Sequence, residues 1–115
     1  MMIQKVNVVE LLTKYREAAE GTGHINPRIA NKWARRLHGY YKQLREIEEG
    51  KAGIVRLMSD ANIHVRCWAA AHSLQWEPEI ARGVLEAIRN QDGTCSFDAK
   101  WILKSFDEGK LMFDY

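Results

Sequence analysis

Residues 59–90 constrain the fold most strongly, because they carry two helical patterns on either side of a single proline. The first pattern has the i, i+3, i+4, i+7 spacing of one helical face, and its members are Val65, Trp68, Ala69 and His72. Asp60 or Asn62 can cap the start of this helix. The proline pushes the preceding residues out of helical geometry, so the helix is expected to stop near Gln75. Pro78 suits the first turn of a second helix, and the short link makes the two helices antiparallel.

Four further helices are expected from the same periodicity. Glycine-rich turns and the pair Asn26-Pro27 separate them, and Gly50 with Gly53 marks a break before the third. The expected ranges are 7–20, 27–48, 52–58 and 97–107, the last capped by Ser96. The inward stripe of the long helix is expected to be Ile29, Trp33, Leu37, Tyr40, Leu44 and Ile47, which leaves Tyr41 outside it.

The pattern therefore predicts an all-α protein of about six helices arranged as antiparallel hairpins. No stretch alternates like a strand over six residues, apart from a weak case at residues 3–9. Three hairpins stacked side by side would bury one continuous core, and about three such units are the minimum for a stable array. A closed helical bundle suits the same periodicity, so the pattern leaves both arrangements open.

The composition indicates one ordinary globular domain spanning residues 1–115. Hydrophobic residues make up 46% and charged residues 28%, which excludes wholesale disorder. The net charge of +2 is too small to indicate nucleic-acid binding by itself. The beginning of the chain lacks a signal-peptide pattern, and no apolar run is long enough for a membrane span. We therefore expect a cytoplasmic protein without a membrane partner.

A short signature in this region is similar to that of HEAT-type helical repeats, and it reads Asp60-x4-Val65-Arg66-x2-Ala69-Ala70. Leu74 departs from it, since it lies one residue later than the usual leucine. The longer pattern resembles a small bacterial family with HEAT-like folds, catalogued as a domain of unknown function. The matching segments, over about residues 9–111, are Ala30-Asn31-Lys32, Val65-Arg66-x-Trp68-Ala69-Ala70-x-His72-x-Leu74 and Gly109-Lys110-Leu111.

The resemblance implies a HEAT-like α-α superhelix and assigns no catalytic residue. Small proteins of this general kind also occur as immunity proteins beside bacterial toxin genes, including those of contact-dependent growth inhibition. What the resemblance implies about function is therefore a binding role: neutralising a cognate toxin.

Motifs for catalysis, nucleotides, metals and cofactors are missing from the sequence, so no enzyme activity and no cofactor are expected. His72 is either a base or ligand, or a core histidine that donates one ring N–H to a backbone carbonyl; the second interpretation is favoured because it has no partner at ligand spacing. Arg66 with Asp60 is either a substrate clamp or, as favoured, an ion pair between hairpins. Cys67 is interpreted as a small buried hydrophobe.

Two binding functions remain. The favoured one is an immunity protein that blocks the active site of a toxin, such as a contact-dependent inhibition nuclease, with carboxylates in the toxin's basic cleft and aromatics as anchors. Its tentative partner-binding residues are Glu46, Glu48, Glu49, Trp76, Asp107, Glu108, Phe113, Asp114 and Tyr115. The alternative is a helical repeat that binds nucleic acid through basic residues, namely Arg28, Lys32, Arg35 and Arg36.

Overall fold

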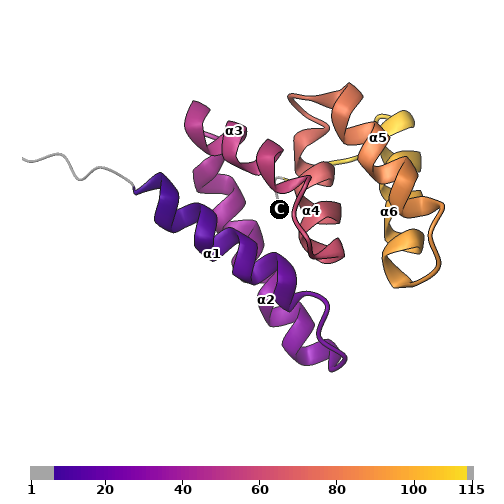
Figure 1. Ribbon diagram of the computed structural model, residues 1–115, viewed down its shortest axis with the longest axis horizontal. Coiled ribbons are helices and arrows are strands. Elements are labelled where there is room, and N and C mark those ends of the chain that lie inside the picture. Colours follow the sequence, from indigo (N-terminus) through magenta and orange to yellow (C-terminus); the bar gives the residue numbers. More distant parts are fainter. Residues whose placement is uncertain (1–6, 114–115) are drawn as a thin grey trace, which may run out of the picture.

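The computed structural model describes residues 7–113 and contains six α-helices and no strand within that range. The helices are α1 (Val8–Gly21), α2 (Pro27–Leu44), α3 (Glu48–Leu57), α4 (Ile63–Ser73), α5 (Pro78–Arg89) and α6 (Thr94–Asp107) (Figure 1). The prediction of an all-α protein with six helices is confirmed. Asp114 and Tyr115 lie outside the described residues.

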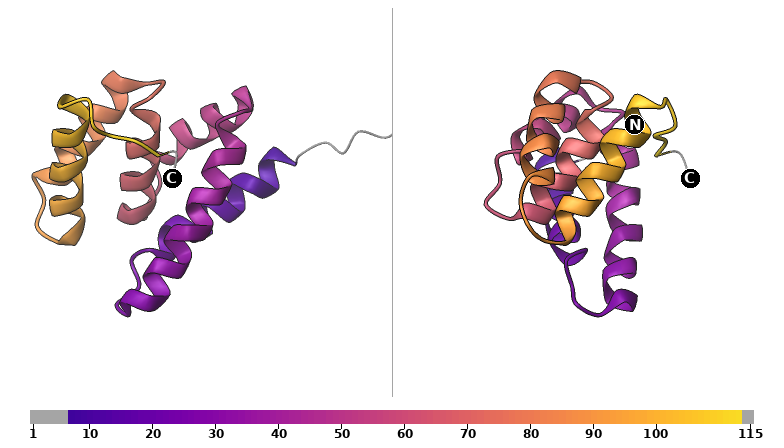
Figure 2. Two further views of the ribbon diagram at one scale, coloured as in Figure 1. Left: turned by 180° about the vertical axis from the view of Figure 1, so that it is seen from behind. Right: turned by 90° about the vertical axis from the view of Figure 1, so that its right-hand side faces the viewer.

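The helices form three antiparallel hairpins arranged as an open stack. The middle hairpin, α3 and α4, packs against α1 on one side and against α5 and α6 on the other. The two outer hairpins lie on opposite sides of α4, as the views from the front and from behind both show (Figures 1 and 2). Of the two arrangements that the periodicity left open, the described residues adopt the stacked array.

Local sequence signals account for where several helices begin. The side chain of Asn26 accepts a hydrogen bond from the Arg28 N–H (3.0 Å), and Asn62 accepts from the N–H groups of His64 and Val65 (2.9 and 3.2 Å). These bonds satisfy donors that the first turn of a helix leaves unpaired. Prolines at the starts of α2 and α5 cost nothing there, because their missing N–H groups have no helical acceptor.

Three predicted helix boundaries are wrong, and Ser96 lies inside the last helix instead of capping it. The long helix ends at Leu44 rather than at 48, and α3 begins at Glu48, so Gly50 and Gly53 lie inside a helix. A Cβ at Gly50 would overlap the carbonyl oxygen of Leu44, so this glycine permits a close approach of two backbones instead of breaking a helix. The last helix begins at Thr94 after Gly93, whose φ of 126° favours glycine.

Because of this close approach, Gly50→Ala is expected to lower the free energy of unfolding by about 1–3 kcal/mol, the usual range for overpacking. The matched control is Gly83→Ala in α5, where an added Cβ meets nothing within 4 Å. That change is expected to raise the free energy of unfolding by about 0.5–1 kcal/mol, since alanine is the better helix former. Urea unfolding followed by circular dichroism gives both values, and equal effects in the two variants would contradict the close approach.

Aromatic rings from all three hairpins meet at the centre of the core. The fully buried Tyr41 of α2 stacks on His72 of α4, with ring centroids 3.9 Å apart and planes 10° from parallel. The hydroxyl of Tyr15 in α1 lies 2.6 Å from His72 Nδ1. Phe113, which follows α6, meets the His72 ring edge-on at 4.8 Å. The placement of Tyr41 outside the stripe is therefore wrong, and Tyr40 is the less buried of the two.

His72 has the predicted core position but a different partner. It is 1% exposed, and its Nδ1 faces the Tyr15 hydroxyl rather than a backbone carbonyl. Its Nε2 is buried without a hydrogen-bond partner. Burial, with smaller electrostatic contributions from the nearby His38 and Arg45, lowers the pKa of His72 to about 3. The imidazole is therefore neutral at physiological pH, and it packs in the core as an aromatic ring.

The ion pair between hairpins involves a different arginine from the one predicted. Arg16 of α1 makes a bidentate contact with Asp60, at 2.9 and 3.1 Å. Arg66 instead donates to the backbone carbonyls of Asp60 and Ala61, at 2.9 and 3.0 Å. The Arg16 hydrogen bonds hold the pKa of the Asp60 carboxyl below its usual value. Asp60 thus joins α1 to the start of α4, and Arg66 stabilises the turn between α3 and α4.

The chain reverses direction after α6 and returns toward the first two hairpins. Gly109 has a φ of 70°, which lets the Lys110 N–H reach back to the Ser105 carbonyl at 2.8 Å. The following segment crosses toward the middle of the molecule (Figure 2) and places Phe113 against Tyr41 and His72. This contact ties the third hairpin to the first two.

Candidate binding groove

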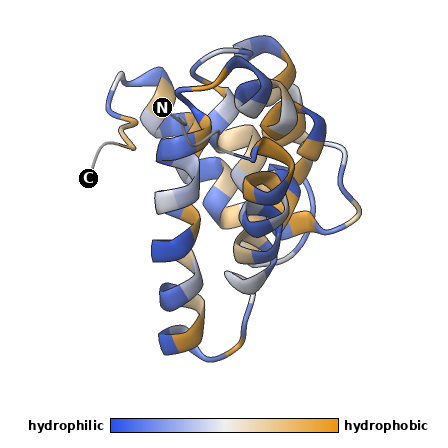
Figure 3. Ribbon diagram, turned by 90° about the vertical axis from the view of Figure 1, so that its left-hand side faces the viewer, coloured by the Kyte–Doolittle hydropathy of each residue, from blue (hydrophilic) through white to orange (hydrophobic). Residues whose placement is uncertain are grey.

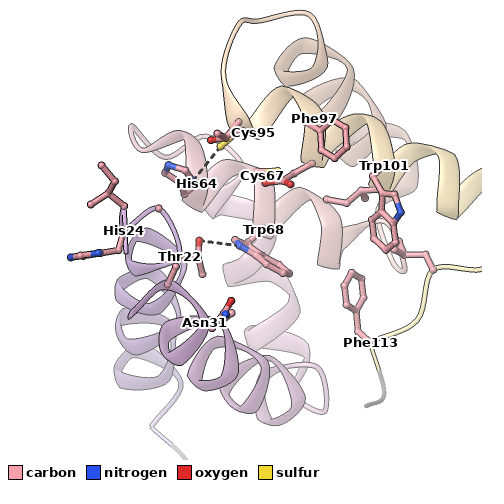
Figure 4. A pocket seen from close by; sticks show the side chains of 18 of the residues that line it. Thr22, His24, Asn31, His64, Cys67, Trp68, Cys95, Phe97, Trp101 and Phe113 are labelled. Carbon is pink, nitrogen blue, oxygen red and sulfur yellow. Dashed lines mark hydrogen bonds between the residues drawn. The ribbon is translucent and has the colours of Figure 1, made fainter. Parts of the chain in front are cut away.

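A groove of about 880 Å³ lies on the concave side of the stack, between α2 and α6, with α4 as its floor (Figure 4). The loop between α1 and α2 closes one side and the segment after α6 another. The lining residues are mostly apolar or aromatic, and none of them is a lysine or an arginine: Thr22, Gly23, His24, Ile25, Ala30, Asn31, Ala34, His64, Cys67, Trp68, Thr94, Cys95, Phe97, Asp98, Trp101, Ile102, Leu111, Met112 and Phe113.

One wall of the groove is aromatic and unusually exposed. Phe97 and Trp101 lie four residues apart on α6 and point into the groove (Figure 4). They are 73% and 59% exposed, and Met112 beside them is 69% exposed. The opposite wall, on α2, carries the small side chains of Ala30 and Ala34 at the same spacing. The groove is therefore apolar and wide open to solvent.

A hydrogen bond between the first two hairpins holds the floor of the groove. The indole N–H of Trp68 in α4 donates to the Thr22 hydroxyl at 3.1 Å, and that hydroxyl donates to the Ala19 carbonyl at 2.6 Å. Trp68 is thereby fixed in the gap between the first and second hairpins (Figure 4). A rigid floor of this kind presents its ring to a ligand without first having to order it.

A thiol and an imidazole meet at one end of the groove. Cys95 Sγ lies 3.2 Å from His64 Nδ1, and the backbone of Gly23 packs closely against the other side of the imidazole. Burial raises the pKa of the Cys95 thiol, and the carboxylate of Asp98 raises it further. Burial, with smaller contributions from the neighbouring Cys95 and Asp98, raises the pKa of the Cys67 thiol to about 12. Both thiols are therefore neutral, whereas a nucleophilic cysteine needs a lowered pKa.

The structure does not gather the acidic residues predicted to bind a partner. Glu46, Glu48 and Glu49 lie where α2 meets α3, whereas Asp107 and Glu108 lie at the end of α6, on the other side of α4 (Figure 1). Most have a basic neighbour: Arg45 lies 3.9 Å from Glu46, Lys51 lies 3.0 Å from Glu48, Lys110 lies 3.8 Å from Glu108, and Arg82 pairs with Asp107. None of the five lines the groove.

The predicted aromatic anchors largely belong to the core. Trp76 is only partly exposed and stacks on Tyr41, with ring centroids 6.3 Å apart. Phe113 is 7% exposed, because it packs on Tyr41 and His72 while its segment lines the groove. At these two positions the aromatic side chains complete the core. The exposed aromatics of the structure are instead Phe97 and Trp101.

The basic residues proposed for nucleic acid are all exposed on α2. Figure 3 shows this long helix with hydrophilic residues on its outer side and hydrophobic ones toward its neighbours. Arg36 lies over the Trp33 ring, with its guanidinium carbon 4.9 Å from the ring centre. None of the set makes an ion pair with a described carboxylate, and none lines the groove; the set is Arg28, Lys32, Arg35 and Arg36.

One signal in the sequence could have located the groove. The core face of α6 carries the buried residues Ala99, Ile102 and Leu103. Phe97 and Trp101 form a second apolar face of the same helix at i, i+4 spacing. When a helix has two apolar faces, one packs against the core of the protein and the other remains exposed. Such an exposed apolar face indicates a surface that can bind another molecule.

Comparison with protein families, with curated sequences and with solved structures finds no significant match to the chain. Among the helices of residues 7–113, none combines the length and the apolar character required to cross a membrane. Within the same residues, no three histidine, cysteine or acidic side chains are grouped so that they could hold a metal ion. The groove is therefore interpreted from its own geometry.

Proposed function

We propose that the chain is a binding protein that holds a segment of a partner protein in the groove between α2 and α6. The observation that carries this proposal is the exposure of Phe97, Trp101 and Met112 on one wall, at 73%, 59% and 69%. Large apolar side chains that remain so exposed around a concave surface are typical of interaction sites. Aromatic residues of this kind supply much of the binding energy at protein interfaces.

A macromolecular ligand suits the groove better than a small one. Pockets for small molecules bury most of their ligand's surface, and their wall residues are enclosed accordingly. Here the wall residues Phe97 and Trp101 have most of their surface in solvent. A partner that covers the whole wall would bury that surface, and each 100 Å² of apolar area removed from water is worth on the order of 2–3 kcal/mol.

We further propose that the partner is a bacterial toxin domain and that the chain is its cytoplasmic immunity protein. The resemblance to HEAT-like families with immunity members supports this proposal. The two thiols that line the groove are neutral, which fits a protein that binds its partner without reacting with it. The proposed contact surface is now the groove. The carboxylates that the sequence analysis assigned to partner binding are dispersed, and most have basic neighbours. They therefore do not form one acidic surface that could fill a basic cleft of the toxin.

The test is co-expression with the product of the adjacent upstream gene. The wild-type chain is expected to co-purify with that product and to protect cells from it. The double variant Phe97→Ala with Trp101→Ala is expected to lose both properties. The control is Ile80→Ala, which removes a 53% exposed apolar side chain of α5 outside the groove and is expected to leave both intact. If the double variant still co-purifies with the product of the upstream gene, the proposal is wrong.

The alternative, nucleic-acid binding, is favoured by the exposure of the four basic residues on α2 and is weakened by the absence of lysine and arginine from the groove lining. Fluorescence anisotropy with duplex and single-stranded probes at two salt concentrations tests it. Phosphate contacts make such binding strongly salt-dependent. If no salt-sensitive binding appears at low salt, the alternative is excluded.

A further inference from the structure

We propose that the segment held in the groove is an amphipathic α-helix whose apolar face is bordered by acidic residues. This inference rests on the proposed function, because it specifies the partner segment that the groove binds. It follows from two independent features of the structure: the helical spacing of the side chains on both walls, and the charges along the two edges.

The spacing of the wall residues fits a helix. Phe97 and Trp101 on α6 lie four residues apart, and so do Ala30 and Ala34 on α2. Side chains at this spacing form the ridges and grooves through which helices pack against one another. A partner helix can place large side chains over the two alanines and smaller ones over the aromatic wall. Strand addition is not available within residues 7–113, because these contain no strand whose edge could be extended.

Both edges of the groove are basic. On α2, Arg28 and Arg35 share a helical face with the lining residue Asn31, at positions i, i+7 and i+3. On α6, Lys100 and Lys104 each follow an aromatic wall residue by three positions. All four side chains are exposed. None of them makes an ion pair with a carboxylate of the described residues.

Acidic residues bordering the partner's apolar face would complement these edges. Complementary charge at the rim of an interface speeds association and selects the partner more than it adds raw affinity. Among the described residues that line the groove, Asp98 is the one carboxylate, and it lies beside His64 near the start of α6. The lining contains no lysine or arginine, so the positive charge of lysine and arginine near an approaching helix comes from the four basic side chains beside the groove.

The test uses three labelled peptides of about 20 residues, a length at which a helix is reasonably stable in isolation. They share one face of leucine and alanine and differ only at the bordering positions, which are glutamate, glutamine or lysine. Fluorescence anisotropy is expected to rank their affinities in that order, with the glutamate peptide about tenfold tighter than the lysine peptide at low salt. The difference should shrink at physiological ionic strength. Proline in the middle of the glutamate peptide should abolish binding.

Two variants locate the effect. Arg35→Glu with Lys104→Glu is expected to reverse the ranking of the glutamate and lysine peptides. The control Arg56→Glu makes the same kind of charge change on an exposed residue of α3 outside the groove, and it should preserve the ranking. Trp101→Ala should weaken all three peptides about tenfold. Thermal unfolding of each variant establishes that the fold is intact.

The possible failures are distinguishable. Equal affinity for the three peptides would overturn the acidic border. No binding of the glutamate peptide, while the groove double variant still loses the toxin, would overturn the helix but keep the proposed function. A concentration-dependent dimer that Trp101→Ala abolishes would place a second copy of the chain in the groove and overturn the inference. Displacement of the peptide by a single-stranded oligonucleotide, with strong salt dependence, would overturn it in favour of nucleic acid.

Discussion

Replacement of Tyr41 by alanine is expected to lower the free energy of unfolding by about 3–5 kcal/mol, the cost of removing a large buried aromatic side chain. Tyr41 is fully buried, and its ring stacks on His72 and meets Phe113 edge-on. Its hydroxyl accepts a hydrogen bond from the Gln75 side chain at 2.7 Å. The substitution would therefore leave a cavity where three hairpins meet. Urea unfolding monitored by circular dichroism measures the change.

The matched control is Tyr40→Ala, which removes the same side chain from the neighbouring position. Tyr40 is only partly buried at the edge of the core, so its removal leaves a smaller cavity, and a loss of about 1 kcal/mol is expected. The periodicity of the sequence placed Tyr40 in the stripe and Tyr41 outside it. A larger loss for Tyr40 than for Tyr41 would therefore restore the sequence prediction and contradict the observed packing.

The second large effect is a loss of stability in mild acid. The pKa of His72 is about 3 in the folded protein, compared with 6.5 for an unperturbed histidine. Because the unfolded chain binds a proton more readily than the folded one, protonation favours unfolding. Stability is therefore full above pH 6.5 and falls as the pH drops from about 6.5 toward 3. At pH 5 the expected loss from this one residue is ~2 kcal/mol.

The double variant His72→Phe with Tyr15→Phe isolates this effect. It removes the titrating imidazole and also the hydroxyl that would otherwise lose its partner, while it keeps a ring of similar shape against Tyr41. Its free energy of unfolding is expected to change much less between pH 7 and pH 5 than that of the wild type. Chemical denaturation at each pH measures the difference, and parallel pH profiles for the two proteins would show that His72 is not the origin of the acid sensitivity.

Sequence patterns predicted the features of the fold that depend on near neighbours. Asn62 and Asn26-Pro27 mark helix starts because a capping side chain and the backbone N–H groups that donate to it lie within three residues of each other. Gly50 was misinterpreted as a helix break. A glycine is needed there because the backbone of Leu44 lies very close, and a local sequence pattern does not reveal such a distance. Tyr40 and Tyr41 both fit a helical stripe with Leu37 and Leu44, at i+3 and i+4 from Leu37, so the periodicity does not decide which one is buried.

The groove was harder to predict than the helices. Its lining comes from the loop after α1 and from α2, α4, α6 and the segment beyond α6, so it exists only once three hairpins are stacked. Phe97 and Trp101 left a signal as a second apolar face on one helix, whereas the neutral wall of Ala30 and Ala34 left none. The contact between His64 and Cys95 joins residues 31 positions apart and follows no spacing rule.

The return of the chain after α6 has a mechanical consequence. In an open stack the outer hairpins pack mainly against the middle one, so their distance from each other is set indirectly. Phe113 acts as a cross-tie, because it is carried by the third hairpin and inserted beside rings from the first two. Because this contact links the chain after α6 to α2 and α4, loss of the Phe113 ring is expected to loosen the spacing between the two walls of the groove.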